Sequence, residues 1–246
     1  MQIIPAFVTQ NKCYQAGAPL TPRGIMLHSV GTPQPSAAVF ARSFNQYQPG
    51  GVSVCVHAFA QADGTVYQTL PWEMRGWHCG GSANSTHIGV EMTEPSAGMT
   101  RSEAAEQIAG TYRTVVELFA ELCKQYELDP AQDGVIIGHA EGHRRGVASN
   151  HADPELLWRT YDMGYTMDGF RRDVAEAMKN GAREEALDMP RYDSVAEMPQ
   201  WARAGVQRLI DRGVLSGVGN GKLDLSLDMI RTMIVCQRML DEQKET

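Results

Sequence analysis

Short apolar runs in the first half of the chain predict buried β-strands. Residues 24–31 (GIMLHSVG) stay apolar until polar residues and a glycine follow, which is typical of a strand that leaves the core. Residues 52–60 and 66–70 are rich in β-branched side chains and flank the turn sequence ADGT, so they predict a hairpin. Residues 87–92 (HIGVEM) and 134–138 (GVIIG) predict two further strands.

Apolar positions at helical spacing predict helices between and after these strands. One covers residues 36–47 and another covers residues 166–179. The longest begins at Thr100, which forms a capping-box pattern with Glu103, and keeps one apolar face for about six turns. Because strands and helices are mixed without strict βαβ alternation, we expect an α/β (α+β) fold with a mixed central β-sheet flanked by helices.

The pattern changes near the end of this region. Residues 181–191 are polar and contain a glycine and a proline, which is typical of a linker. Beyond them, two amphipathic stretches flank the glycine-rich sequence LSGVGNGKLDL. We therefore expect a domain of residues 1–180, a linker, and a C-terminal helix-loop-helix module of residues 192–246, which is small for independent stability.

The composition fits this organisation and excludes some functions. With 246 residues the chain has room for one ordinary domain and a small second one. Its net charge of −7 argues against a nucleic-acid partner, because such proteins need clustered Lys and Arg to replace phosphate counterions. No apolar run reaches the ~18–20 residues that a helix needs to cross a bilayer, so we expect no membrane insertion.

The first residues and the cysteines indicate where the protein is made. The N-terminal sequence lacks a basic start followed by an unbroken apolar stretch, so we expect no signal peptide. The 5 cysteines are widely spread and include no CxxC pair. We expect them to be mostly free thiols in a protein made in the reducing cytoplasm.

Three potential zinc ligands stand at or just after apolar strands. They are His28, His139 and Asp153, and a catalytic zinc takes three such ligands and keeps a fourth position open. Taken singly, each has a simpler interpretation. A histidine after a strand is more often a hydrogen-bonded structural residue, as we also expect for His57, and Asp153 could cap a helix that begins at Pro154. Spacing alone leaves these alternatives open.

Five strings, in this order, carry a resemblance to a known family. They are GIMLHSVG, HAFAQADGTVYQTLP, RGWHCGG, HIGVEM and GHAEGHRRGVASNHADPELLW. Together they resemble the type 2 N-acetylmuramoyl-L-alanine amidases, relatives of peptidoglycan recognition proteins and of phage lysozymes with amidase activity. The similarity covers roughly residues 20–178. The last string is the most specific and resembles the variant found in Firmicute and phage-borne enzymes.

The resemblance implies an activity and a cofactor. It assigns His28, His139 and Asp153 as ligands of Zn²⁺ and bacterial peptidoglycan as the substrate. The implied reaction is hydrolysis of the amide bond between N-acetylmuramic acid and L-alanine, as in endolysins and autolysins. Two alternatives are a peptidoglycan-binding module without activity and a zinc hydrolase of another amide. Binding modules commonly lack one zinc ligand, whereas this chain has all three.

The same resemblance points to the catalytic groups. Glu91 matches the glutamate at the end of a family strand and is our candidate general base. His151 stands where the family has a lysine, two residues before the last ligand, and is our candidate for stabilising the oxyanion. Glu94 is an alternative to Glu91. Val56 departs from a tyrosine that some relatives have there.

Three residues are candidate substrate contacts. Trp77 and His78 can line the groove and stack on sugar or peptide, although such a pair in a turn is about as often plain packing. Arg144 belongs to a small basic cluster that can hold stem-peptide carboxylates, and a solvated surface explains it equally well.

The C-terminal sequence resembles a single S-layer-homology-like module. Such modules in series bind cell-wall polymers, but one copy is visible here, so a homodimer through this module or simple capping of the catalytic domain is an equal alternative. The family analogy further implies that the enzyme reaches the cell wall after a holin or lysis opens the membrane, as for a prophage endolysin.

Overall fold

The computed structural model describes residues 1–46, 54–188 and 191–242. The chain forms two compact units, Met1–Asn180 and Gly181–Thr246, and each is described by itself. The end of the helix predicted at 36–47 and the start of the strand predicted at 52–60 lie outside the described residues.

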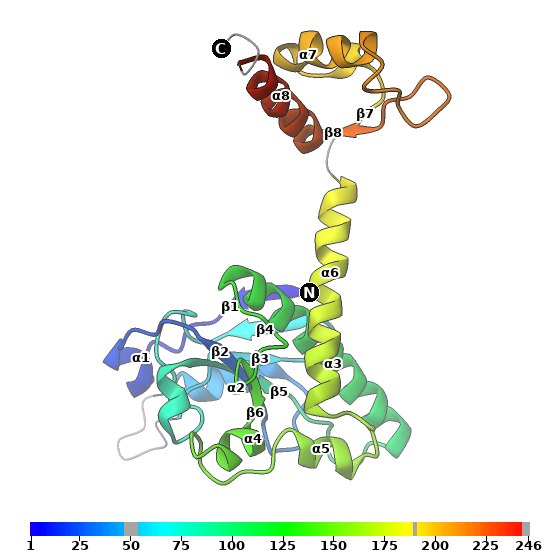
Figure 1. Cartoon of the computed structure of the whole chain (residues 1–246). Helices are drawn as coiled ribbons and strands as arrows, with labels where there is room; N and C mark the ends of the chain where they lie inside the picture. The colour runs from blue at the N-terminus through cyan, green and yellow to red at the C-terminus, as the bar shows by residue number, and fades with distance from the viewer. Residues whose placement is uncertain (47–53, 189–190, 243–246) are drawn as a thin grey trace. The chain divides into compact units, whose positions relative to one another are not determined.

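A mixed sheet forms the centre of the first unit (Figure 1). Its strands are β1 (Gln2–Pro5), β2 (Gly24–Ser29), β3 (Ala58–Ala60), β4 (Thr65–Gln68), β5 (His87–Met92) and β6 (Ile136–Gly138). Their order in the sheet is β1-β4-β3-β5-β2-β6, and every pair is parallel except the β3–β4 hairpin. The predicted mixed central sheet is confirmed. The edge strand β1 was not predicted, because four residues carry too little pattern.

The register of the sheet brings functional positions to one edge. In β2 and β5, His28 pairs with Glu91. In β2 and β6, Leu27 pairs with Gly138, so His139 follows directly beside the end of β2. Because neighbouring parallel strands end at the same edge of a sheet, the ends of these three strands lie together.

Helices cover the sheet. They are α1 (Lys12–Ala16), α2 (Ala37–Phe44), the short 3₁₀ helix η1 (Ser82–Ser85), α3 (Arg101–Gln125), α4 (His139–Arg144), α5 (Glu155–Thr160) and α6 (Met167–Asp188). Thr100 caps α3 through the predicted capping box with Glu103. Side chains alternate along β2, so Ile25 and Leu27 join the large core under α3, α5 and α6. Met26 joins a smaller cluster with η1 on the opposite face, and by alternation His28 shares that face.

Helix α6 is longer than the sequence pattern predicts. We expected a helix over 166–179 and then a linker, but the helix continues to Asp188. Gly181 does not end it, because a glycine inside a helix costs only about 1 kcal/mol relative to alanine. Most of the expected linker is therefore helical.

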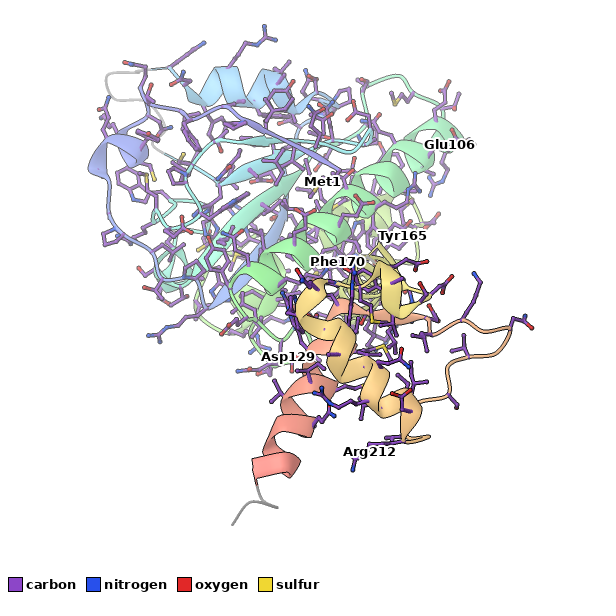
Figure 2. All side chains as sticks on the ribbon, turned by 90° about the horizontal axis from the view of Figure 1, so that it is seen from above. Met1, Glu106, Asp129, Tyr165, Phe170 and Arg212 are labelled. Carbon is purple, nitrogen blue, oxygen red and sulfur yellow. The ribbon has the colours of Figure 1, made fainter. Side chains whose placement is uncertain are left out.

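An aromatic cluster joins α3, α5 and α6. The ring of Phe170, which is labelled in Figure 2, lies 5.0 Å from that of Phe119 and 5.5 Å from that of Tyr112. Trp158 completes the cluster. We expect Phe170→Ala to lower the free energy of unfolding of this unit by about 3–5 kcal/mol, since it removes a fully buried ring. Urea unfolding would measure this. The exposed Met99→Ala is the matched control, and an equal effect of both variants would contradict the prediction.

The second unit contains two helices around a small core. They are α7 (Gln200–Asp211) and α8 (Leu227–Glu242), with the 3₁₀ helix η2 (Val195–Glu197) and an antiparallel pair of β7 (Arg191–Tyr192) and β8 (Leu225–Ser226). The buried apolar side chains of this core are Met198, Ala202, Val206, Leu225, Ile230 and Ile234. The resemblance to an S-layer-homology-like module, with its wall-binding or dimerising role, stays a prediction. Among the described residues, no helix is both long and apolar enough to span a bilayer.

Candidate metal centre

Three separate elements position the three predicted ligands. His28 is the last residue but one of the fully buried strand β2, and His139 begins α4 immediately after β6. Asp153 lies in the loop before α5, where its backbone carbonyl accepts a hydrogen bond from the Ala140 N–H at 3.1 Å. That bond fixes the loop against the first turn of α4. The peptide bond between Asp153 and Pro154 is cis.

The donor atoms of these residues form a compact triangle. His28 Nδ1 lies 3.0 Å from His139 Nδ1 and 3.3 Å from Asp153 Oδ2, and His139 Nδ1 lies 3.5 Å from Asp153 Oδ1. Two donors bound to one tetrahedral zinc at 2.0–2.1 Å are separated by about 3.3 Å. The set of two imidazoles and one carboxylate, at these separations, therefore fits a catalytic zinc ion.

The protonation states also fit a metal site. Burial lowers the pKa of His28, so this imidazole is neutral. Burial raises the pKa of Asp153, but the close contacts of its carboxylate with the His139 and His28 rings outweigh it, so that the pKa lies below its ordinary value. The carboxylate is therefore ionised, and a neutral imidazole and an ionised carboxylate are the forms that bind a metal.

A cleft of about 550 Å³ opens over the donor triangle. Its lining includes the predicted catalytic residues Glu91 and His151 together with Glu94. Leu156, Thr160 and Tyr161, in and directly after helix α5, also line it. Thr160 and Tyr161 lie beyond the last of the five strings, although the helical spacing of Leu156 and Thr160 after a predicted helix start is the signal that could have found this part of the lining.

The candidate substrate contacts lie in different places. His78 lines the cleft, but its Nδ1 meets His28 Nε2 at 2.9 Å and its Nε2 meets the carbonyl of His87 at 3.1 Å. Burial is the main cause that lowers its pKa well below the ordinary value, so the ring is neutral. Trp77 packs on a cluster containing Cys55 and is absent from the described cleft lining. Arg144 lines a neighbouring depression of about 210 Å³ that shares His151 with the cleft.

Glu91 has an unusual environment for a carboxylate. Its side chain is half-buried, and its Oε2 is buried without a hydrogen-bond partner among the described residues. Burial, followed by the charges of Asp153 and Glu94, raises its pKa well above the ordinary value. A carboxyl group of this kind exchanges protons near neutral pH more readily than an exposed one, which suits a general acid or base.

The raised pKa of Glu91 predicts how pH affects the stability of the metal-free protein. An unfolded glutamate titrates near about 4.3, so above that pH the folded state holds the proton more tightly and loses stability as the pH rises. We expect metal-free Glu91→Gln to be about 1–3 kcal/mol more stable than the wild type near neutral pH, because its side chain stays neutral. Below pH ~4 the difference should vanish. Thermal unfolding across this range is the measurement, and parallel pH profiles would contradict the prediction.

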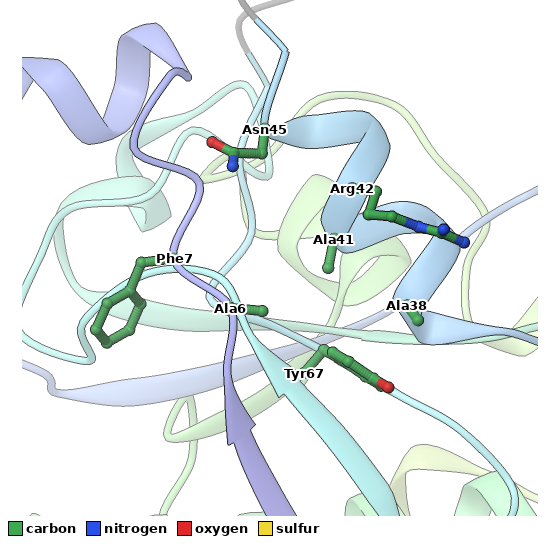
Figure 3. A pocket seen from close by; sticks show the side chains of 7 residues that line it. All are labelled: Ala6, Phe7, Ala38, Ala41, Arg42, Asn45 and Tyr67. Carbon is green, nitrogen blue, oxygen red and sulfur yellow. The ribbon is translucent and has the colours of Figure 1, made fainter.

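A second pocket lies away from this centre. It has a volume of about 490 Å³ and is lined by Ala6, Phe7, Ala38, Ala41, Arg42, Asn45 and Tyr67 (Figure 3). Among these described lining residues, Arg42 is the charged one, and a lone arginine beside small apolar residues offers no acid–base pair. The donor triangle and its cleft are therefore the candidate functional site.

Comparison with known proteins identifies the family of this fold and site. The structure of the hydrolase AmiA from Staphylococcus aureus in complex with its ligand aligns with a TM-score of 0.59 and 21% identity, over 75% of this chain and 86% of that one. A mutant endolysin from Bacillus subtilis aligns with a TM-score of 0.53 and 21% identity, over 71% and 99%. The catalytic domain of XlyA gives 0.52 and 22%, over 71% and 99%. These similarities show the fold.

A search of curated proteins gives no match. The family model described as N-acetylmuramoyl-L-alanine amidase matches residues 18–156, which is more than half of the 246 residues. This range contains the whole donor triangle and Glu91. The chain therefore belongs to the N-acetylmuramoyl-L-alanine amidase family.

Proposed function

We propose that the protein is a zinc-dependent amidase that hydrolyses the bond between N-acetylmuramic acid and L-alanine in bacterial peptidoglycan. The observation that carries the proposal is the triangle of His28, His139 and Asp153 donor atoms, two of whose residues line an open cleft together with Glu91, whose Oε2 has no partner among the described residues. Family membership supplies the substrate class.

Hydrolysis of an amide needs two kinds of catalysis, one for attack on the carbonyl and one for departure of the nitrogen. An amide carbonyl is a poor electrophile and its nitrogen is a poor leaving group. Zinc, when bound by the three donors, supplies a Lewis acid that polarises the carbonyl and lowers the pKa of a water molecule toward ~7. Glu91 accepts the proton of the attacking water and passes it to the departing alanine nitrogen. Its raised pKa suits both transfers near neutral pH.

His151 is placed to stabilise the negative charge that develops on the carbonyl oxygen. Its Nδ1 lies 3.2 Å from His139 Nε2 and 3.4 Å from the Ser149 hydroxyl, so both contacts use the same nitrogen. When Nδ1 accepts the hydrogen bond from His139, a neutral His151 carries its proton on Nε2 and can donate it to an oxyanion. The ring therefore replaces a lysine without needing a positive charge.

One assay separates the proposed reaction from its alternatives. Purified peptidoglycan is incubated with the protein, and newly exposed N-terminal alanine is quantified with and without a chelator. We expect about one zinc per chain, release that stops on chelation, and recovery when zinc returns. Binding to peptidoglycan without release would favour a recognition module. Release that persists in chelator would exclude the metal mechanism.

A further inference from the structure

We propose that His78 and Ser149 are positioning residues that hold the protons of His28 and His139 on Nε2 and so present both Nδ1 lone pairs to the metal. The proposal rests on the zinc site proposed above. It assigns His78 a role behind the ligand in place of the expected substrate contact, and it adds Ser149, which had no predicted role.

The proton position on His78 follows from its contact with a backbone carbonyl, which has no proton to donate. The His87 carbonyl can only accept, so at 3.1 Å the Nε2 of His78 must donate to it. A neutral imidazole with its proton on Nε2 has a bare Nδ1, which must accept from His28 Nε2 at 2.9 Å. His28 therefore carries its single proton on Nε2, and its Nδ1 faces the donor triangle as a lone pair.

Ser149 acts in the same way on the second histidine. Its hydroxyl lies 3.0 Å from the carbonyl of Cys79 and donates its one proton there, since this is its shortest contact and a carbonyl can only accept. The hydroxyl oxygen then offers lone pairs to His139 Nε2 at 3.2 Å, and it shares the single N–H of that nitrogen with His151 Nδ1, which also lies at 3.2 Å. His139 thus also holds its proton on Nε2, which leaves Nδ1 for the metal.

A single loop supports both positioning residues. The side-chain oxygen of Asn84 accepts hydrogen bonds from the backbone N–H of His78 at 2.9 Å and of Cys79 at 3.0 Å. The Cys79 carbonyl in turn accepts from the Ser149 N–H at 2.8 Å. The same loop therefore fixes the backbone of both positioning residues.

Glycines allow these close contacts. A Cβ on Gly89 would lie 2.4 Å from the His78 ring, and a Cβ on Gly81 would lie 2.1 Å from the Val147 carbonyl. Side chains at these positions would push His78 off strand β5 and separate the loop from the segment that carries Ser149. Gly81 and Gly89 therefore leave room for the two acceptor atoms, His78 Nδ1 and Ser149 Oγ.

Substitution pairs that differ mainly in the acceptor test the proposal. His78→Asn keeps an acceptor atom near the Nδ1 position and His78→Leu removes it in nearly the same volume, while Ser149→Thr keeps the hydroxyl and Ser149→Ala removes it. Zinc dissociation constants are measured by competition with a chromogenic chelator. We expect the Leu and Ala variants to bind zinc about 10–100-fold more weakly, and the Asn and Thr variants to recover most of the affinity.

Control variants and an NMR measurement separate failure of the positioning role from failure of the proposed function. The exposed His143→Leu and Ser102→Ala should leave zinc affinity unchanged. Nitrogen-15 NMR of the metal-free wild type should place the protons of His28 and His139 on Nε2, which requires no variant to fold. Protons on Nδ1, or Leu and Ala variants with wild-type affinity, would overturn the positioning role alone. A wild type that binds no zinc would overturn the proposed function as well.

Discussion

Replacing Glu91 by glutamine is expected to slow amide hydrolysis by about 10²–10⁴-fold while zinc stays bound. Glutamine keeps the shape of the side chain but cannot accept the proton of water or pass it to the leaving nitrogen. The three metal donors lie on other residues, so metal content should not change. Release of N-terminal alanine from peptidoglycan and metal analysis of the same preparation would measure both quantities.

The matched control is Glu94→Gln in the same cleft. The Oε1 atom of Glu94 already accepts a hydrogen bond from the Gly31 N–H at 2.9 Å, whereas Oε2 of Glu91 has no partner among the described residues. We expect Glu94→Gln to retain most of the activity. Full activity of Glu91→Gln with loss in Glu94→Gln would reassign the general base.

Removing one of the proposed metal ligands should lower the rate of hydrolysis even more than Glu91→Gln does. We expect hydrolysis by Asp153→Ala and by His139→Ala to fall to the background rate. We also expect zinc binding to weaken by more than the about 10–100-fold that follows from loss of a residue that only hydrogen-bonds a ligand. Each change leaves two donors, and Asp153→Ala also removes the negative charge that offsets the cation. Metal content after dialysis and the rate of alanine release are the measurements.

An exposed acid provides the comparison for Asp153. Asp162 lies outside the cleft and forms an ion pair with Arg101, so Asp162→Asn should retain zinc and activity. If Asp153→Ala kept a full complement of zinc and hydrolysed peptidoglycan normally, the donor set would be wrong.

The strands that carry the site could be predicted from the sequence, but the pairing between these strands could not. The apolar runs that end in His28 and His139 mark strands because burial on both faces requires such runs. Their adjacency could not be derived, since strand order depends on packing between distant segments. The pairing of Leu27 with Gly138, which brings the two histidines together, is visible in the structure alone.

Side-chain roles were the least predictable part, as two histidines show. His57 and His78 both come from strings shared with the family, yet they differ in function. His57 donates from Nε2 to the Met74 carbonyl at 2.8 Å and accepts the Gly89 N–H at Nδ1, and burial lowers its pKa to about 4. His78 instead contacts His28, one of the three proposed metal ligands. The chemistry depends on which groups meet each nitrogen, and sequence spacing does not specify this.

The separation in sequence between the proposed metal ligands has a consequence for the stability of the protein against unfolding. His28 and Asp153 are separated by 125 positions, and their donor atoms meet within 3.3 Å. An ion held there works as a reversible cross-link across most of the catalytic unit, and loop-closure entropy favours such a link most when the enclosed segment is long. Occupancy of the site would thus protect the protein against unfolding and against proteolysis of the unfolded chain.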